Sequence, residues 1–256
     1  MTRAVLLATV VLAGLTGEAG AERLTIALST PEVKINSNFT GTSLTIFGVV
    51  ERDAATVGRT TAGYQVAVVV RGPGESVVAR RKDRVLGVWA NNASQTFLSA
   101  PSFYAVDTST GLSDLAPAEQ LRRLQIGFEN ISLIDARSTA SSDADQTTFR
   151  EAFLRLKEQS GLYAMSTGVD FIGDTIFRAT VWIPANVPVG HYAAVVTLFS
   201  DGTPLATAED RIFISKTGFE RFMFAASRQS ALVYGLATVI LALFTGWLAG
   251  VIFRRD

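Results

Sequence analysis

The sequence predicts a mainly β protein, an immunoglobulin-like β-sandwich with a helical insertion, followed by one C-terminal transmembrane helix. Three observations lead to this prediction. Short runs rich in Val, Ile, Phe and Thr alternate with Gly, Pro, Asn and Asp through the middle of the chain, as in sandwich strands joined by turns. Two stretches break that pattern with apolar residues near helical spacing. A long apolar segment without charge stands near the C-terminal end.

The first element is a secretory signal peptide over residues 1–21. Arg3 precedes the apolar run AVLLATVVLAGL, and the small residues that follow end in Ala19-Gly20-Ala21. A charged start, a short apolar core and an A-x-A site are the parts of such a signal. The run is shorter than the roughly 20 apolar residues that a membrane span needs. We therefore expect cleavage after Ala21, with an uncleaved anchor as the alternative.

A β-sandwich domain is expected over residues 22–216. Its most legible part is a turn at Pro188 and Gly190, a strand, and a hairpin turn at Asp201-Gly202. The pattern predicts strands but not their order in the sheets. The predicted strands are Arg23 to Leu28, Ser43 to Glu51, Tyr64 to Arg71, Ser76 to Lys82, Val85 to Ala90, Phe103 to Val106, Leu162 to Asp170, Thr175 to Ile183, His191 to Ser200 and Leu205 to Ser215.

A helical insertion is expected over about residues 114–160. Its helices are Ala116 to Leu124 and Asp145 to Gln159, the second with Phe149 and Phe153 one turn apart and with Ser160-Gly161 at its end. Helices inserted in this way usually cover an open edge of a sandwich.

The C-terminal region is predicted to anchor the domain to a membrane. Residues 231–253 carry no charge and are long enough to span a bilayer. Arg228 precedes them and Arg254-Arg255 follow, which favours a single pass with the domain outside and a cytoplasmic stub at 254–256. Residues 217–230 form a short amphipathic juxtamembrane segment with several aromatic residues.

Composition limits the chemistry that this chain can carry. Lys plus Arg number 23, as do Asp plus Glu, so bulk charge gives no support for nucleic-acid binding. Cys is absent, and the one histidine, His191, stands at the start of an apolar strand, where a residue without special role is the commoner outcome. No nucleotide-binding glycine motif occurs. We therefore expect no cofactor and no metal.

Carboxylates are the residues that leave an enzyme open as an alternative. Asp143 with Asp145, and Asp170 with Asp174, could join a hydrolytic pair or a Ca²⁺ site if the fold brought them together. Turn chemistry explains both pairs equally well. The expectation is therefore a protein that is not an enzyme.

Two groups of residues are candidate sites. Arg80, Lys82 and Arg84 would share one face of a strand, where they could bind a small anion, a lipid headgroup or an acidic surface. The alternative is a solvent-facing strand kept soluble by its charge. In the C-terminal helix, Ala242, Gly246 and Gly250 recur every four residues and form a smooth stripe that would let a second helix approach closely.

Four motifs in order carry a family resemblance. They are KINSNFTGTSLTIFG from Lys34 to Gly48, VVARRKDRVLGVWANN from Val77 to Asn92, APSFYAV from Ala100 to Val106, and VPVGHYAAVVTLFSDG from Val187 to Gly202. With the signal and the C-terminal span, they resemble an alphaproteobacterial family of transmembrane proteins of unknown function. The resemblance implies a bacterial inner-membrane protein whose main domain lies in the periplasm. It also implies a candidate partner, because members tend to be encoded near permeases of the sulfite-exporter type.

Three functional hypotheses follow. The first is a non-catalytic, membrane-anchored periplasmic accessory or assembly subunit of an inner-membrane protein, which is held through the small-residue stripe. The second is a membrane-tethered module that binds a small anion or a lipid headgroup through the cations. The third and least favoured is an Asp/Glu hydrolase. The sequence leaves open which partner or ligand binds and whether the chain self-associates.

Overall fold

Alternating burial along the strands divides their side chains between a shared interior and two outer faces. The computed structural model describes residues 22–52, 63–85, 87–138, 143–217 and 231–252. In β11 (Ile176–Pro184), every second side chain is buried, and β3 (Gly41–Glu51) shows the same period over most of its length. Because successive side chains of a strand point to opposite faces, this period produces sheets with one apolar side.

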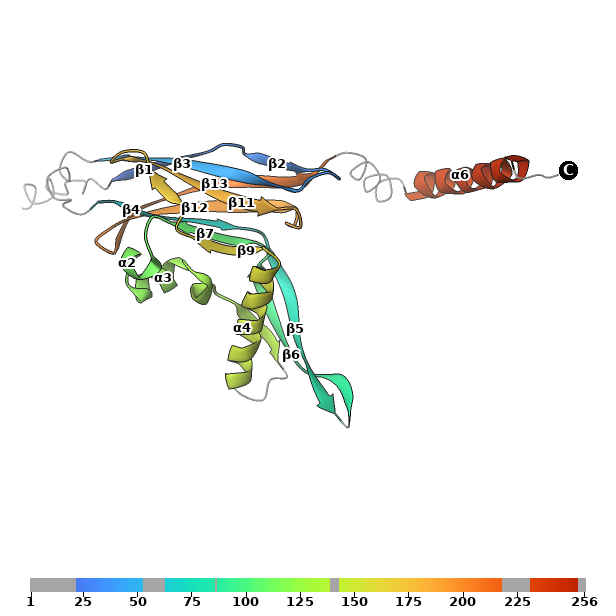
Figure 1. Cartoon of the computed structure of the whole chain (residues 1–256), viewed down its shortest axis with the longest axis horizontal. Helices are drawn as coiled ribbons and strands as arrows, with labels where there is room; N and C mark the ends of the chain where they lie inside the picture. The colour runs from blue at the N-terminus through green and yellow to red at the C-terminus, as the bar shows by residue number, and fades with distance from the viewer. Residues whose placement is uncertain (1–21, 53–62, 86, 139–142, 218–230, 253–256) are drawn as a thin grey trace, which may run out of the picture.

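Two such sheets pack face to face (Figure 1). The four-stranded sheet has the order β1-β3-β11-β10, and the six-stranded sheet has the order β2-β13-β12-β4-β7-β9. This division of the strands is that of an immunoglobulin-like sandwich with β7 and β9 added at one edge of the second sheet and β2 at the other, which confirms the predicted sandwich. The remaining bounds are β1 (Arg23–Leu28), β2 (Glu32–Ile35), β4 (Gln65–Arg71), β7 (Tyr104–Thr108), β9 (Tyr163–Ser166), β10 (Val169–Phe171), β12 (Gly190–Ser200) and β13 (Thr203–Lys216).

The main core lies between the two sheets and includes fully buried Leu44, Ile46, Phe177 and Leu198. Phe177 lies directly opposite Gly48 in the β3–β11 ladder. A Cβ added at Gly48 would stand 2.0 Å from Cζ of Phe177, so only glycine leaves room for the aromatic ring there.

A long hairpin and several helices are inserted into the six-stranded sheet. The hairpin, which we call the arm, consists of β5 (Gly74–Val85) and β6 (Val88–Pro101), and β8 (Ile134–Ser138) pairs with β6 to complete a third sheet. The helices are α2 (Leu112–Leu115), α3 (Ala118–Leu124), the 3₁₀ turn η1 (Phe128–Asn130) and α4 (Asp143–Gln159). In Figure 1 the arm and α4 project together away from the sandwich. A second core cluster, with Phe97, Tyr104, Phe153 and Tyr163, joins them to the outer face of the six-stranded sheet.

Three sequence-based assignments were wrong. The strand predicted at Val85 to Ala90 is the tip of the arm, where Gly87 takes a φ of +85° and the chain reverses. The strand predicted at Leu162 to Asp170 is divided into β9 and β10, which belong to different sheets. No strand was predicted from Asn91 to Thr96, where β6 continues, whereas the predicted helices Ala116 to Leu124 and Asp145 to Gln159 correspond to α3 and α4.

The C-terminal part of the described chain is α6 (Ala231–Ile252). Among the described residues, no helix combines the length and the apolar character that crossing a membrane requires. The signal peptide at residues 1–21, most of the juxtamembrane segment and the stub at 254–256 lie outside the described residues.

Candidate functional site

The two faces of the arm have different environments. On the inner face, Val77 and Ala79 are partly buried and pack in the second core cluster, together with Phe97 of β6. On the outer face, Val78 is 48% exposed. The alternation follows from the pleat of β5 and leaves its even-numbered side chains facing away from the helices.

Two ion pairs hold the inner face of the arm against helix α4, one through Arg81 of the arm and one through Lys157 of the helix. Nη1 of Arg81 donates to Oδ1 of Asp145 at 2.6 Å, and the guanidinium lies 5.9 Å from the ring centroid of Phe149. Near the base of the arm, Nζ of Lys157 forms an ion pair with Glu75. The arm is therefore attached to the helix both at its root and well along its length.

The root of the arm is fastened to α3 by Arg71, the last residue of β4. Its guanidinium donates to the carbonyl oxygens of Leu124 and Gln125, at 3.3 and 2.8 Å, and to Oε1 of Gln125 at 2.6 Å. These carbonyls belong to the C-terminal end of the helix, where backbone acceptors lack intrahelical partners. The guanidinium also lies 5.5 Å from the ring centroid of Tyr104, whose burial raises its pKa to about 12.

The predicted cations all lie on the outer face of the arm. Arg80, Lys82 and Arg84 are exposed, and they alternate with Arg81, which faces α4. Their cross-strand neighbours on β6 are uncharged, namely Ser94 for Arg80, Asn91 for Lys82 and Trp89 for Arg84. The arrangement can present positive charge to a flat anionic surface.

Sequence reasoning missed Trp89 as part of this surface. Its indole is 66% exposed, and the Arg84 guanidinium lies 6.0 Å from the ring centroid, within the range of a cation–π contact. Trp89 joins the face because the chain reverses at Gly87 instead of continuing as one strand. That glycine, inside an otherwise regular apolar run, was the available signal.

The small-residue stripe lies on α6. A Cβ added at Gly246 or Gly250 would meet no atom within 4 Å, so the stripe is open. Large apolar side chains elsewhere on the helix are also exposed, among them Leu232 at 90%, Leu243 at 70% and Trp247 at 63%.

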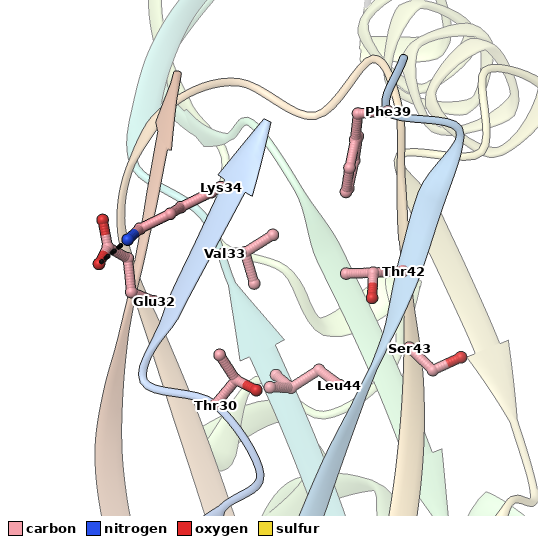
Figure 2. Close-up of a pocket in the computed structure, with 8 residues that line it drawn as sticks. All are labelled: Thr30, Glu32, Val33, Lys34, Phe39, Thr42, Ser43 and Leu44. Atoms are coloured by element: carbon pink, nitrogen blue, oxygen red, sulfur yellow. Dashed lines mark ion pairs between the residues drawn. The ribbon is translucent and has the colours of Figure 1, made fainter. Parts of the chain in front are cut away.

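A small hollow lies between β2 and β3, at the place where the chain passes from one sheet to the other (Figure 2). Glu32 and Lys34 form an ion pair of 3.6 Å at one side of it, and Val33, Phe39 and Leu44 supply apolar walls. Its volume of about 160 Å³ is about half the smallest volume typical of small-molecule sites. We assign it no ligand.

Of the carboxylates named from the sequence, Asp145 and Asp170 have different ion-pair partners, and the side chain of Asp143 lies outside the described part of the structure. Asp145 binds Arg81, and Oδ2 of Asp170 lies 3.4 Å from Nη2 of Arg178. Across the described part of the chain, no three His, Asp or Glu side chains are grouped so that they could hold a metal ion. His191 is exposed and lies against the ring of Phe213, with 4.8 Å between the centroids.

Asp107 of β7 is a buried carboxylate that the sequence did not indicate. It is 6% exposed, and it accepts a hydrogen bond from Oγ of Ser166, its neighbour in the β7–β9 ladder. Burial raises the pKa of Asp107, and the hydrogen bond from Ser166 offsets part of that effect. The hydroxyl of the adjacent strand satisfies Oδ1, whereas Oδ2 is buried without a hydrogen-bond partner among the described residues, so we treat Asp107 as a structural contact between β7 and β9.

Comparison with known proteins places the chain in a family. No curated protein matches the sequence. Among solved structures, domain 1 of VCBP3 from Branchiostoma floridae is 12% identical, with 78% of this chain and 98% of that chain covered and a TM-score of 0.26. AggA, the major subunit of aggregative adherence fimbriae type I from Escherichia coli, is also 12% identical, with 77% and 97% covered and a TM-score of 0.28. The model of the family described as "Putative transmembrane protein (Alph_Pro_TM)" matches residues 23–255, and the chain therefore belongs to this family.

Proposed function

We propose that this protein is a non-catalytic accessory or assembly subunit of a bacterial inner-membrane protein. In this proposal the charge-free segment of residues 231–253, identified from the sequence, anchors the chain in a single pass, and the β-sandwich stands in the periplasm. The family is one of transmembrane proteins, which supports a membrane setting. A permease of the sulfite-exporter type is the partner that the sequence resemblance suggests.

The observation that carries the proposal is the exposure of apolar side chains around α6. Val239 is 56% exposed, Leu241 65% and Phe244 55%, and at about 100° per residue Val239 and Leu241 lie on nearly opposite sides of the helix. A helix that is apolar all round is covered by lipid or by other protein, since each exposed apolar Å² costs roughly 25 cal/mol in water. The charge-free sequence of residues 231–253, with arginines on both sides, is the further support for lipid.

The stripe of Ala242, Gly246 and Gly250 supports a helical partner. Helices in lipid gain little from the hydrophobic effect and associate mainly where small residues let their backbones pack closely. The open surface over Gly246 and Gly250 is the part of α6 where a second helix could come nearest.

Affinity purification of the tagged full chain from its own membranes in mild detergent tests the proposal. We expect an integral membrane protein to co-purify in a fixed ratio, and to be lost when Gly246→Leu and Gly250→Leu are combined. Ala237→Leu is the matched control, because nine residues at about 100° each put position 237 on the opposite side of the helix from Gly246. Purification of the protein alone, or an unchanged partner in the double variant, would contradict a stripe-mediated subunit.

A further inference from the structure

We propose that the arm docks on the anionic phospholipid surface of the membrane that holds α6, through Arg80, Lys82, Arg84 and Trp89. The inference rests on the proposed attachment by α6, and it assigns a partner to a face that the accessory function leaves unused.

The topology brings the root of the arm to the end of the sandwich that leads to α6. Strand β12 is antiparallel to both β4 and β13, so these two strands run in the same direction. Arg71, at the end of β4, lies opposite Ala193, and Ile214, near the end of β13, lies opposite Gly190. The chain therefore leaves the sandwich toward the arm and toward α6 from the same end, which is the end nearest the membrane if α6 is the anchor (Figure 1).

Packing at the root supports this placement. A Cβ added at Gly190, the first residue of β12, would lie 3.0 Å from Cγ of Pro73, just before the arm. At the same end, the amide of Thr217, which follows β13, donates to the carbonyl of Ile35 at 2.8 Å. Both exits are thus held against the sandwich by local contacts.

The charges on the arm match a plane of phosphates. Side chains two residues apart in a strand are separated by about 7 Å, so the three cations form a row on one face, with a register shift of the β5–β6 ladder between Arg81 and Lys82. Among the residues that the structure describes, the ion pairs of the arm join Arg81 to Asp145 and Glu75 to Lys157, and they do not include this row. Each cation held near an anionic bilayer contributes about 1 kcal/mol of attraction.

The aromatic tip favours lipid over a protein or a dissolved anion. Between Arg84 and Trp89 the sequence VLGV has no charge, and an exposed Trp beside a cation is typical of the membrane interface. A dissolved anion would be bound best by donors that converge from several sides, which a sheet face lacks. An acidic protein would explain the row of cations but not the exposed Trp89 beside them.

Tethering makes a weak contact sufficient. Once α6 is in the bilayer, the arm meets the surface at an effective concentration in the millimolar range, so a contact too weak to recruit a free protein would still be populated.

The test uses the full chain in lipid vesicles and a fluorophore that responds to its environment. Because the chain has no Cys, a single Asn91→Cys places the label beside Trp89 on the outer face, and Thr203→Cys places a control label at the opposite end of the sandwich. The vesicles contain phosphatidylcholine alone or phosphatidylcholine mixed with phosphatidylglycerol. We expect the label at position 91 to enter an apolar environment only with the anionic lipid, and the label at position 203 to remain in water.

Charge variants assign the effect to the row of cations. Combining Arg80→Gln, Lys82→Gln and Arg84→Gln should lower the contact equilibrium on the order of a hundredfold, and added salt should act in the same direction. Arg123→Gln, Arg155→Gln and Arg211→Gln together remove the same charge from exposed positions elsewhere and should leave the signal unchanged.

The outcomes separate the two proposals. A chain that alkaline carbonate extracts from both kinds of vesicle would refute attachment by α6 and the inference with it. A chain that stays in the vesicles while the label at position 91 remains in water would refute only the docking of the arm. A response that requires native membrane proteins, and not anionic lipid, would also refute it and would assign the arm to an acidic protein.

Discussion

Replacing Lys157 with Met removes the cation that holds α4 against the root of the arm. The Lys157 side chain is only 11% exposed, and it binds Glu75, whose side chain is 38% exposed. Its Nζ also donates to the carbonyl of Ser102 at 3.3 Å and lies 5.9 and 5.8 Å from the ring centroids of Phe153 and Tyr163. Met keeps most of the volume of the side chain, so the loss is chiefly electrostatic.

The structure sets the size of the effect. Because solvent reaches Glu75, the ion pair is worth about 1 kcal/mol, nearer to an exposed pair than to a buried one. The carbonyl left without its donor costs about 1 kcal/mol, and each cation–π contact adds about 0.5 kcal/mol or less. We therefore expect Lys157→Met to destabilise the packing of the arm by about 2 to 3 kcal/mol, which corresponds to an opening equilibrium raised roughly 30- to 150-fold.

Hydrogen exchange of the full chain in mild detergent measures this opening strand by strand. We expect faster exchange in β5 and α4 and unchanged exchange in β3 and β11, because the Lys157 ammonium interacts only with groups near the root of the arm. Arg155→Met, an exposed position on the same helix, is the matched control and should change stability by less than about 0.5 kcal/mol. Equal acceleration in the sandwich strands, or none in β5, would show that Lys157 does not hold the arm in this way.

Two other substitutions test buried polar groups. For Asp107→Asn, we expect a higher melting temperature at pH 7. Burial raises the pKa of the carboxyl in the folded state. The free energy of unfolding is therefore highest below the pKa of the unfolded state and falls as the pH rises through the pKa of the folded state. The advantage of Asn should therefore vanish toward about pH 4, and an advantage that persists in acid would contradict the electrostatic cause. For Arg71→Ala, urea unfolding should show a loss of about 1 to 3 kcal/mol because the carbonyls at the end of α3 lose their donor. Arg71→Lys should recover only part of the lost stability, since an ammonium cannot reproduce the fork of the guanidinium. Full recovery would show that the positive charge alone is responsible.

The sandwich strands were predictable because their two faces differ. In β11 every second side chain is buried, β12 alternates until both of its faces become buried from Val196 to Phe199, and turn residues bound both strands. β6 was not predicted beyond its first residues, because its sequence from Asn91 to Thr96 is largely polar. It is a strand because it pairs with β5, a tertiary contact that outweighs local propensity.

The division of the strand predicted at Leu162 to Asp170 was also beyond the reach of sequence pattern. Val169 packs in the core between the sheets, whereas Tyr163 packs in the cluster beneath the helices. Both parts have β-forming residues, and a strand that changes sheets has the same local composition as one that continues.

The candidate surface was predicted only in its charges. Alternation along a strand was enough to put Arg80, Lys82 and Arg84 on one face, and the structure agrees. The packing of the opposite face against α4 depends on contacts distant in sequence, whereas the reversal at Gly87 and the pairing of Arg84 with Trp89 are local to the hairpin. These long-range contacts make the difference between a charged strand and an arm with two distinct sides.

The other exposed side chains on the outer face of the arm indicate that its cations do more than keep the strand soluble. Nearer the root, the same face exposes three apolar side chains, Val78 at 48%, Leu98 at 39% and Ile134 at 56%, with the last two paired across β6 and β8. A solvated sheet face would normally be polar there, and α4 covers only the inner side. The face has apolar side chains near the root, cations farther out and an aromatic ring near the tip. These three kinds of side chain match a surface that has negative charge on the outside and apolar chains beneath. Anionic lipid has that layered chemistry, and water does not.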